Sequence, residues 1–150
     1  MFDDLRDLYQ EVILDHGRRP RHGSRLAAFD ATAKGDNPMC GDRVQVFVRR
    51  DDAGRIAQAG FEARGCAISI ASADLMAEVV AGLSDEQARA LAARFRDLAR
   101  TGDVAGEDAA IERLRPLAGV HEFPSRVKCA TLPWHALLAA LDGKGEASSE

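Results

Sequence analysis

Residues 35–42, Gly-Asp-Asn-Pro-Met-Cys-Gly-Asp, place a thiol and a carboxylate two residues apart on a glycine- and proline-rich loop. An apolar run follows this loop directly, and the remaining cysteines, Cys66 and Cys129, lie far along the chain. Three thiolates and one carboxylate form a closed tetrahedral ligand set for zinc. We therefore expect folding to bring four ligands to one metal site at one end of one domain: Cys40, Asp42, Cys66 and Cys129.

Length and charge narrow the class of protein. The 150 residues are enough for one ordinary domain that buries roughly 70% of its unfolded surface, so a metal is not needed for a core to form. The formal net charge of -4 and the pI near 5.6 provide no general attraction to phosphate backbones. We therefore do not expect nucleic acid to be the main partner.

The cysteine count and the N-terminus indicate a compartment. Three cysteines without a Cys-x-x-Cys pair do not make the disulfide framework of a small secreted protein. The N-terminal segment is acidic and amphipathic, so neither a signal peptide nor a membrane span is visible. We expect a cytoplasmic protein that has no membrane partner. Its domain should cover residues 1–142, and the small, polar tail at 143–150 should be disordered.

Hydrophobic periodicity predicts an α+β fold. Apolar residues recur every three or four positions through the first 16 residues, which indicates a helix that Gly17 ends. Alternation indicates three strands, at 25–33, 43–50 and 56–63. A change of parity between Ile56 and Ala59 indicates a bulge. We expect a three-stranded antiparallel sheet with several helices packed against one face.

The remaining helices carry two of the candidate ligands. We expect them at 67–81, 84–101, 111–118 and 124–141. Cys66 would stand at the start of the first, where unpaired backbone N–H groups favour a thiolate. Ser84 and Gln87 form a capping box for the second. Pro133 lacks the N–H that would bond the carbonyl of Cys129, at a typical cost of about 3 kcal/mol, so we expect a kink or a restart there.

A local basic patch interrupts the acidic chain at residues 16–23, His-Gly-Arg-Arg-Pro-Arg-His-Gly. It is either a solvated loop or a docking surface for an acidic partner. We do not expect its two histidines to bind metal. His135 follows Cys129 by six residues, roughly 240° around a helix, so it should face away from the metal site.

Three motifs together carry a family resemblance. These are residues 35–42, residues 65–69 (Gly-Cys-Ala-Ile-Ser) and residues 123–132 (Phe-Pro-Ser-Arg-Val-Lys-Cys-Ala-Thr-Leu). In this order and spacing they strongly resemble the SufU proteins of the IscU/NifU-like superfamily, over nearly the whole chain. Lys128 stands where the IscU type carries a histidine ligand, and residues near 100 to 120 form an additional insertion. Both features follow the SufU pattern, and Pro133 is a local departure.

The resemblance implies a zinc-dependent sulfurtransferase. Such an enzyme takes sulfur from a pyridoxal-phosphate cysteine desulfurase of the SufS type for iron-sulfur cluster assembly, and other Suf assembly proteins are further candidate partners. Two alternatives stay open. The first is an IscU-like scaffold that binds iron or builds a [2Fe-2S] cluster on the same four ligands. The second is a structural zinc module that binds a partner.

Sulfur transfer needs a thiolate that attacks a persulfide. Zinc deprotonates its thiols and protects them from oxidation, but coordination also lowers their nucleophilicity. An accepting cysteine must therefore leave the metal. Cys40 is the best placed to do so, because Gly41 follows it on a loop. The resemblance implies the same residue as acceptor. Arg126 or Lys128 could offset the charge of the site, although each is as well explained by exposure to solvent.

Overall fold

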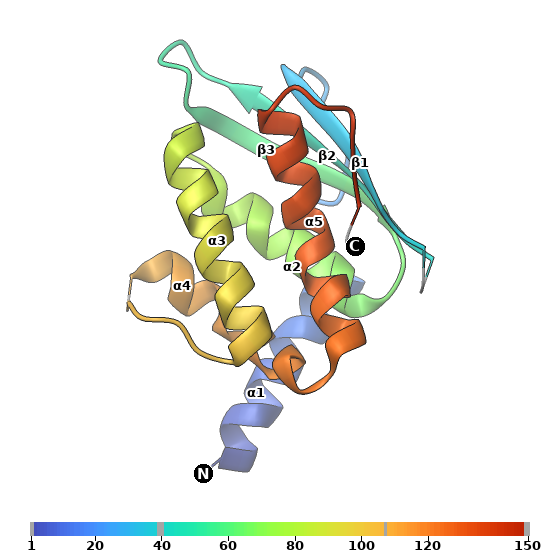
Figure 1. Ribbon diagram of the computed structural model, residues 1–150, viewed down its shortest axis with the longest axis vertical. Coiled ribbons are helices and arrows are strands. Elements are labelled where there is room, and N and C mark those ends of the chain that lie inside the picture. The colour runs from blue at the N-terminus through green and yellow to red at the C-terminus, as the bar shows by residue number, and fades with distance from the viewer. Residues whose placement is uncertain (1, 39–40, 107, 149–150) are drawn as a thin grey trace.

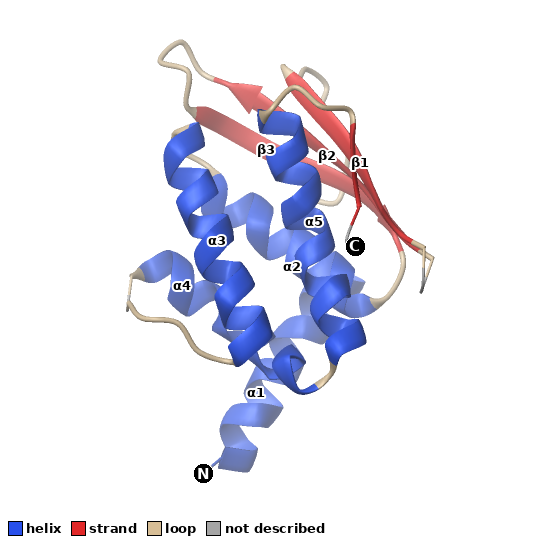
Figure 2. Cartoon of the chain, viewed as in Figure 1, coloured by secondary structure: helices blue, strands red, loops and turns tan. Residues whose placement is uncertain are grey.

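The computed structural model describes residues 2–38, 41–106 and 108–148. The helices and the segments that connect them lie on one face of a single sheet (Figure 1). The elements in chain order are α1 (Phe2–Arg18), β1 (Ala31–Asn37), β2 (Asp42–Arg50), β3 (Ile56–Arg64), α2 (Ala67–Val80), α3 (Asp85–Thr101), α4 (Ala109–Leu114), the 3-10 helix η1 (Arg115–Glu122), α5 (Pro124–Leu141) and β4 (Glu146–Ser148). The predicted α+β class is confirmed (Figure 2).

The sheet has the strand order β3-β2-β1-β4. β1 pairs with β2 and β2 with β3, both antiparallel, as predicted. The predicted bulge is present, because Arg49 pairs with Gln58 while Arg50 pairs with Ile56, which leaves Ala57 as the extra residue. The bulge lies at the end of the sheet opposite the Asn37–Asp42 pair, so the register near the first motif is regular.

The first strand begins later than predicted. It starts at Ala31, and the preceding segment crosses the outer face of the sheet instead. There Phe29 packs edge-on against Phe47, with ring centroids 5.0 Å apart, and the Arg25 guanidinium lies 5.3 Å from the centroid of the Phe47 ring. Phe47 is the apolar residue on the otherwise polar side of β2, and this cover buries it completely. Burial of that ring explains the shift.

The C-terminal tail was expected to be disordered and the sheet to have three strands. Glu146–Ser148 instead forms β4, which pairs in parallel with β1. The Lys34 N–H also donates to the carbonyl of Gly145 at 2.9 Å. β1 would otherwise be an edge strand with unpaired backbone groups, and these accept a short neighbour whatever its side chains are. The domain boundary at residue 142 stays a prediction.

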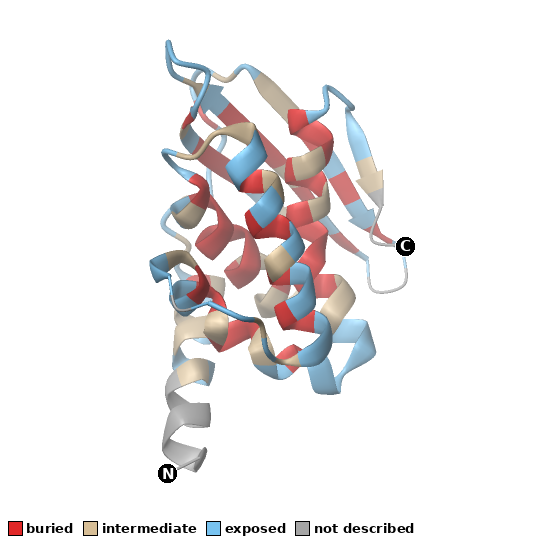
Figure 3. Cartoon of the chain, turned by 60° about the vertical axis from the view of Figure 1, so that its left-hand side comes forward, coloured by how far each residue is buried: buried red, intermediate tan, exposed pale blue. Residues whose placement is uncertain are grey.

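α2 and α5 pack against the sheet, and α3 packs against α5 and η1. The buried residues gather between the helices and the sheet (Figure 3). α5 continues through Pro133, which is buried, so the expected restart is not present. Packing on several sides of α5 offsets the hydrogen bond that the proline lacks. The Ser84–Gln87 capping box that opens α3 is confirmed. None of the described helices combines the length and the apolarity needed to cross a membrane.

We expected α1 to end at Gly17, but the helix continues to Arg18. Gly17 instead allows a close approach: a Cβ there would lie 3.0 Å from both the Cβ and the carbonyl oxygen of Ala67. This contact places the end of α1 against the first residue of α2, directly after Cys66. The first helix therefore supports the part of the fold where a candidate ligand stands.

Candidate metal centre

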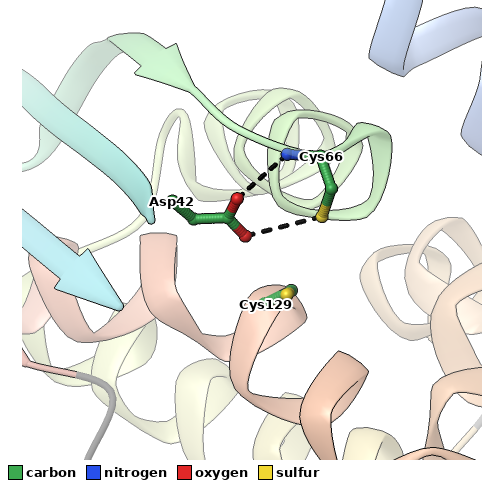
Figure 4. A group of neighbouring side chains, drawn as sticks. All are labelled: Asp42, Cys66 and Cys129. Atoms are coloured by element: carbon green, nitrogen blue, oxygen red, sulfur yellow. Dashed lines mark hydrogen bonds between the residues drawn. The ribbon is translucent and has the colours of Figure 1, made fainter. Parts of the chain in front are cut away.

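Three of the four predicted ligands lie together at one end of the sheet. Asp42 is the first residue of β2, Cys66 is the N-cap of α2, and Cys129 lies in the second turn of α5. Their ligand atoms, one from each residue, are all within 4.8 Å of one another. The side chains converge from three different elements (Figure 4). The fold thus brings together residues that are 24 and 63 positions apart in sequence.

Cys66 fixes the position of the Asp42 carboxylate through two hydrogen bonds. Its carboxylate is buried, with 2% of the residue exposed. The Cys66 backbone N–H donates to Asp42 Oδ1 at 3.0 Å, and the Cys66 thiol donates to Oδ2 at 3.5 Å. The backbone bond fixes the carboxylate relative to the start of α2 and leaves Oδ2 on the side of the two sulfur atoms (Figure 4). Asp42 therefore presents an oxygen to the same space as both thiols.

Gly65 makes room for this carboxylate. Its φ of 153° lies in a region that favours glycine, and a Cβ at this position would lie 2.2 Å from Asp42 Oδ1. Any side chain here would overlap the oxygen that accepts the Cys66 N–H. The glycine before the second cysteine is thus a positioning residue for Asp42, a role that the sequence motif alone did not disclose.

We expect Gly65→Ala to weaken zinc binding by about 10- to 100-fold, because it displaces a ligand from its supporting hydrogen bond. Backbone strain should also cost roughly 1 to 3 kcal/mol. A matched control is Gly54→Ala, since Gly54 has a φ of 81° but nothing within 4 Å of its Cβ position. Competition with a chromogenic zinc chelator measures both. Equal zinc affinity in the two variants would contradict the proposed role of Gly65.

The fourth predicted ligand, Cys40, lies outside the described residues. On its C-terminal side Gly41 has a φ of 76°, and the Gly41 N–H donates to the Asn37 carbonyl at 2.8 Å, which closes the turn before β2. Among the described histidines, cysteines and acids, only Asp42 and the two other cysteines form such a group. His135 is not part of it, in agreement with its expected direction.

The donor set fits zinc. A tetrahedral zinc site with Zn–S distances near ~2.3 Å places its ligand atoms roughly 3.5 to 4 Å from one another, and a spread of up to 4.8 Å needs only small side-chain adjustments. A buried carboxylate beside two sulfur atoms is also an expensive arrangement unless a cation or hydrogen bonds compensate it. Thiolates with one carboxylate are ligands that zinc accepts. The role of Asp42, Cys66 and Cys129 as ligands stays a prediction.

A second buried polar cluster, which the sequence did not predict, links α2 to the end of α1 and to the loop that follows α1. Asp74 is 1% exposed; His16 Nδ1 hydrogen-bonds to its Oδ2, and the His22 backbone N–H donates to its Oδ1 at 2.8 Å. Arg113 Nη2 donates to His16 Nε2 at 3.2 Å. Since arginine only donates, His16 Nε2 accepts and Nδ1 carries the hydrogen given to Asp74. His16 is thus a buried structural residue rather than part of a solvated basic loop.

A single signal in the sequence could have disclosed this cluster. Asp74 is the one acidic residue in the first eleven positions of a helix otherwise made of small and apolar residues. A carboxylate on an apolar helix is buried only when it is paired. Asp74 stands two turns after Cys66, so its bonds to the end of α1 and to the following loop stabilise the helix whose first turn carries the candidate ligand.

Comparison with known proteins establishes the family. The sequence pattern of the NifU-like N-terminal domain matches residues 8–141, and the chain belongs to this family. The matched range begins in α1 and ends with α5, so it includes the whole of the predicted metal centre.

Two curated relatives and one solved structure show how close the match is. The chain is 38% identical to the iron-sulfur cluster assembly scaffold protein IscU of Streptococcus pyogenes, over 91% of this chain and 84% of the relative. It is 37% identical to the zinc-dependent sulfurtransferase SufU of Bacillus subtilis, over 89% of each. The crystal structure of a putative SUF-system scaffold protein from Fervidobacterium islandicum, at 28% identity, superposes with a TM-score of 0.78 and covers 87% of this chain and 94% of that one.

Proposed function

We propose that the chain is a zinc-dependent sulfurtransferase that receives persulfide sulfur from a SufS-type cysteine desulfurase for iron-sulfur cluster assembly. The observation that carries the proposal is the convergence of Asp42, Cys66 and Cys129 within 4.8 Å, in a relative of the Bacillus subtilis sulfurtransferase SufU. Only Gly41 separates Cys40 from Asp42 in the sequence, so we expect the Cys40 thiol to complete this group. We place the reaction in the cytoplasm, where such thiols stay reduced.

In this proposal Cys40 is the acceptor. Its thiolate attacks the outer sulfur of the desulfurase persulfide, and a new S–S bond forms between Cys40 Sγ and that sulfur. The S–S bond within the desulfurase breaks, and the desulfurase cysteine leaves as a thiolate. The hydrogen stays on the transferred sulfur, and the exchange consumes no oxidant or reductant.

The other three predicted ligands form the rest of the proposed zinc site. Asp42, Cys66 and Cys129 would bind Zn²⁺, which keeps cysteine thiols deprotonated when it is bound. Asp42 keeps its direction through the Cys66 N–H, and Cys129 is held in α5 with 2% of the residue exposed. Gly41, with its positive φ, lies between the acceptor and the first residue of β2. Asp42 and Cys129 stand on regular elements and Cys66 directly precedes one, whereas the sequence around Cys40 is rich in glycine and proline. We therefore expect Cys40 to be the ligand that moves toward a partner.

The second candidate is a scaffold that builds a [2Fe-2S] cluster on the same ligands. It is favoured by the equally close match to the Streptococcus pyogenes scaffold protein IscU. Three cysteines and a carboxylate can hold iron as well as zinc, so the ligand types alone do not separate the two.

Metal content divides the two candidates. We expect the full chain, purified without oxygen, to be colourless and to carry about one zinc ion per chain when measured by plasma mass spectrometry. It should also raise the turnover of a SufS-type desulfurase supplied with cysteine. A brown protein that contains iron and sulfide, and that leaves desulfurase turnover unchanged, would favour the scaffold. Stoichiometric zinc without any effect on turnover would indicate a structural zinc module.

A further inference from the structure

A groove runs between α3 and α5, on a side of α5 that does not carry the candidate metal ligand. Two adjoining hollows form it, with volumes of about 270 and 470 Å³, and they share Arg96, Thr131 and His135. The two helices lie side by side and run in opposite directions (Figure 1). The groove therefore extends from Arg89 near one end to Lys128 near the other.

The groove carries uncompensated positive charge. Arg96 and Arg100 are exposed and stand one turn apart on α3, and Lys128 faces them from α5. No carboxylate of the described residues forms an ion pair with any of these three cations, whereas Arg89 at the far end is paired with Asp142 at 2.6 Å. Three free cations in one groove are notable in a chain whose net charge is -4.

Two further features define what the groove can hold. Burial, together with the charge of Arg96, lowers the pKa of His135, so its imidazole adds no cation at neutral pH. The floor is apolar: Trp134 is 2% exposed and stacks on Phe95, with ring centroids 4.8 Å apart. Among the described lining residues no phenylalanine, tyrosine or tryptophan ring is exposed, so the groove lacks the large aromatic surfaces on which nucleic-acid bases stack.

We propose that this groove docks an acidic segment of a partner protein. Two carboxylates of the segment meet Arg96 and Arg100, which as i and i+4 residues lie about 6 Å apart, and a third meets Lys128. Lys128 directly precedes Cys129. A segment bound here therefore ends beside the metal centre and leaves the centre itself uncovered. The inference depends on charge and shape alone, and it holds whether the centre transfers sulfur or builds a cluster.

The test is binding of a fluorescein-labelled hexaglutamate peptide to the full chain, followed by fluorescence anisotropy at low ionic strength. We expect saturable binding that weakens as salt is added. The double variant Arg96→Gln/Arg100→Gln should raise the Kd about fivefold or more, because it removes two of the three cations. Both side chains are exposed, so the fold should be kept. Far-UV circular dichroism checks this.

The matched control is Arg49→Gln/Arg55→Gln, which removes the same charge from exposed positions on or next to the sheet. Its Kd should stay close to that of the unchanged chain. Equal losses in the two double variants would show that only net charge matters and would overturn the proposal. So would the absence of saturable binding, or preferential binding of an oligothymidylate of the same charge. Because the readout involves neither metal nor desulfurase, its failure is separate from a failure of the proposed function.

Discussion

Replacing Cys40 by serine should abolish sulfur acceptance while most of the zinc stays bound. The hydroxyl of serine is a far poorer nucleophile than a thiolate, so acceptance should fall by a factor of about 10³ or more. Three predicted ligands would remain: Asp42 at the start of β2, Cys66 at the N-cap of α2, and Cys129 buried in α5. Stimulation of desulfurase turnover and zinc content, measured on the same sample, test both halves of this expectation.

Cys129→Ser is the matched comparison, because it makes the same chemical change at a buried ligand. We expect this variant to lose zinc first and activity as a consequence. Added zinc should then restore part of its activity, whereas it should restore none to the Cys40 variant. If both variants kept zinc and lost activity equally, Cys40 and Cys129 would have the same role, and the assignment of a single acceptor would be wrong.

Replacing Asp74 by alanine should destabilise the fold by about 3 to 5 kcal/mol. The change leaves two donors without their acceptor, the His16 Nδ1–H and the His22 backbone N–H, and His16 itself is 5% exposed. A loss of this size is a large part of the total stability of an ordinary domain. Urea unfolding followed by circular dichroism measures it, with midpoints compared at unchanged slope.

The neighbouring pair of Arg113 and Glu78 provides the control. Its atoms Nε and Oε2 are 2.5 Å apart, but the two side chains are 41% and 43% exposed. Glu78→Gln should therefore cost no more than about 1 kcal/mol, because solvent screens an exposed ion pair. If Asp74→Ala were as mild as Glu78→Gln, the buried cluster would contribute little, and the contact between the end of α1 and α2 would depend on packing alone.

Residue chemistry made the grouping of Asp42, Cys66 and Cys129 predictable. Each belongs to a short motif at the end of a periodic segment, and ends of packed elements meet at the edges of a domain. The α+β class and most helix limits followed from periodicity and capping in the same way. Ser84 and Gln87 show this most directly, because a capping box is a local interaction that needs no tertiary information.

What escaped prediction depends on tertiary contacts. The strand at Glu146–Ser148 forms because β1 has a free edge. Three residues are too few for their hydrophobic periodicity to predict this pairing. In the sequence Gly65 is only one residue of a motif. Its role depends on a tertiary contact, because a Cβ at this position would lie 2.2 Å from Asp42 Oδ1. The sequence pattern predicts that His16 belongs to a basic loop, whereas α1 continues past it and its ring hydrogen-bonds to Asp74.

The central claim is that Cys40 accepts sulfur, and mass spectrometry of the chain tests it most directly. The protein is incubated with a SufS-type desulfurase and cysteine, alkylated, digested and analysed peptide by peptide. The account predicts one added sulfur atom on the peptide that contains Cys40, and none on the peptides of Cys66 and Cys129. Added sulfur on Cys66 or Cys129 at the wild-type rate in the Cys40→Ser variant would contradict it.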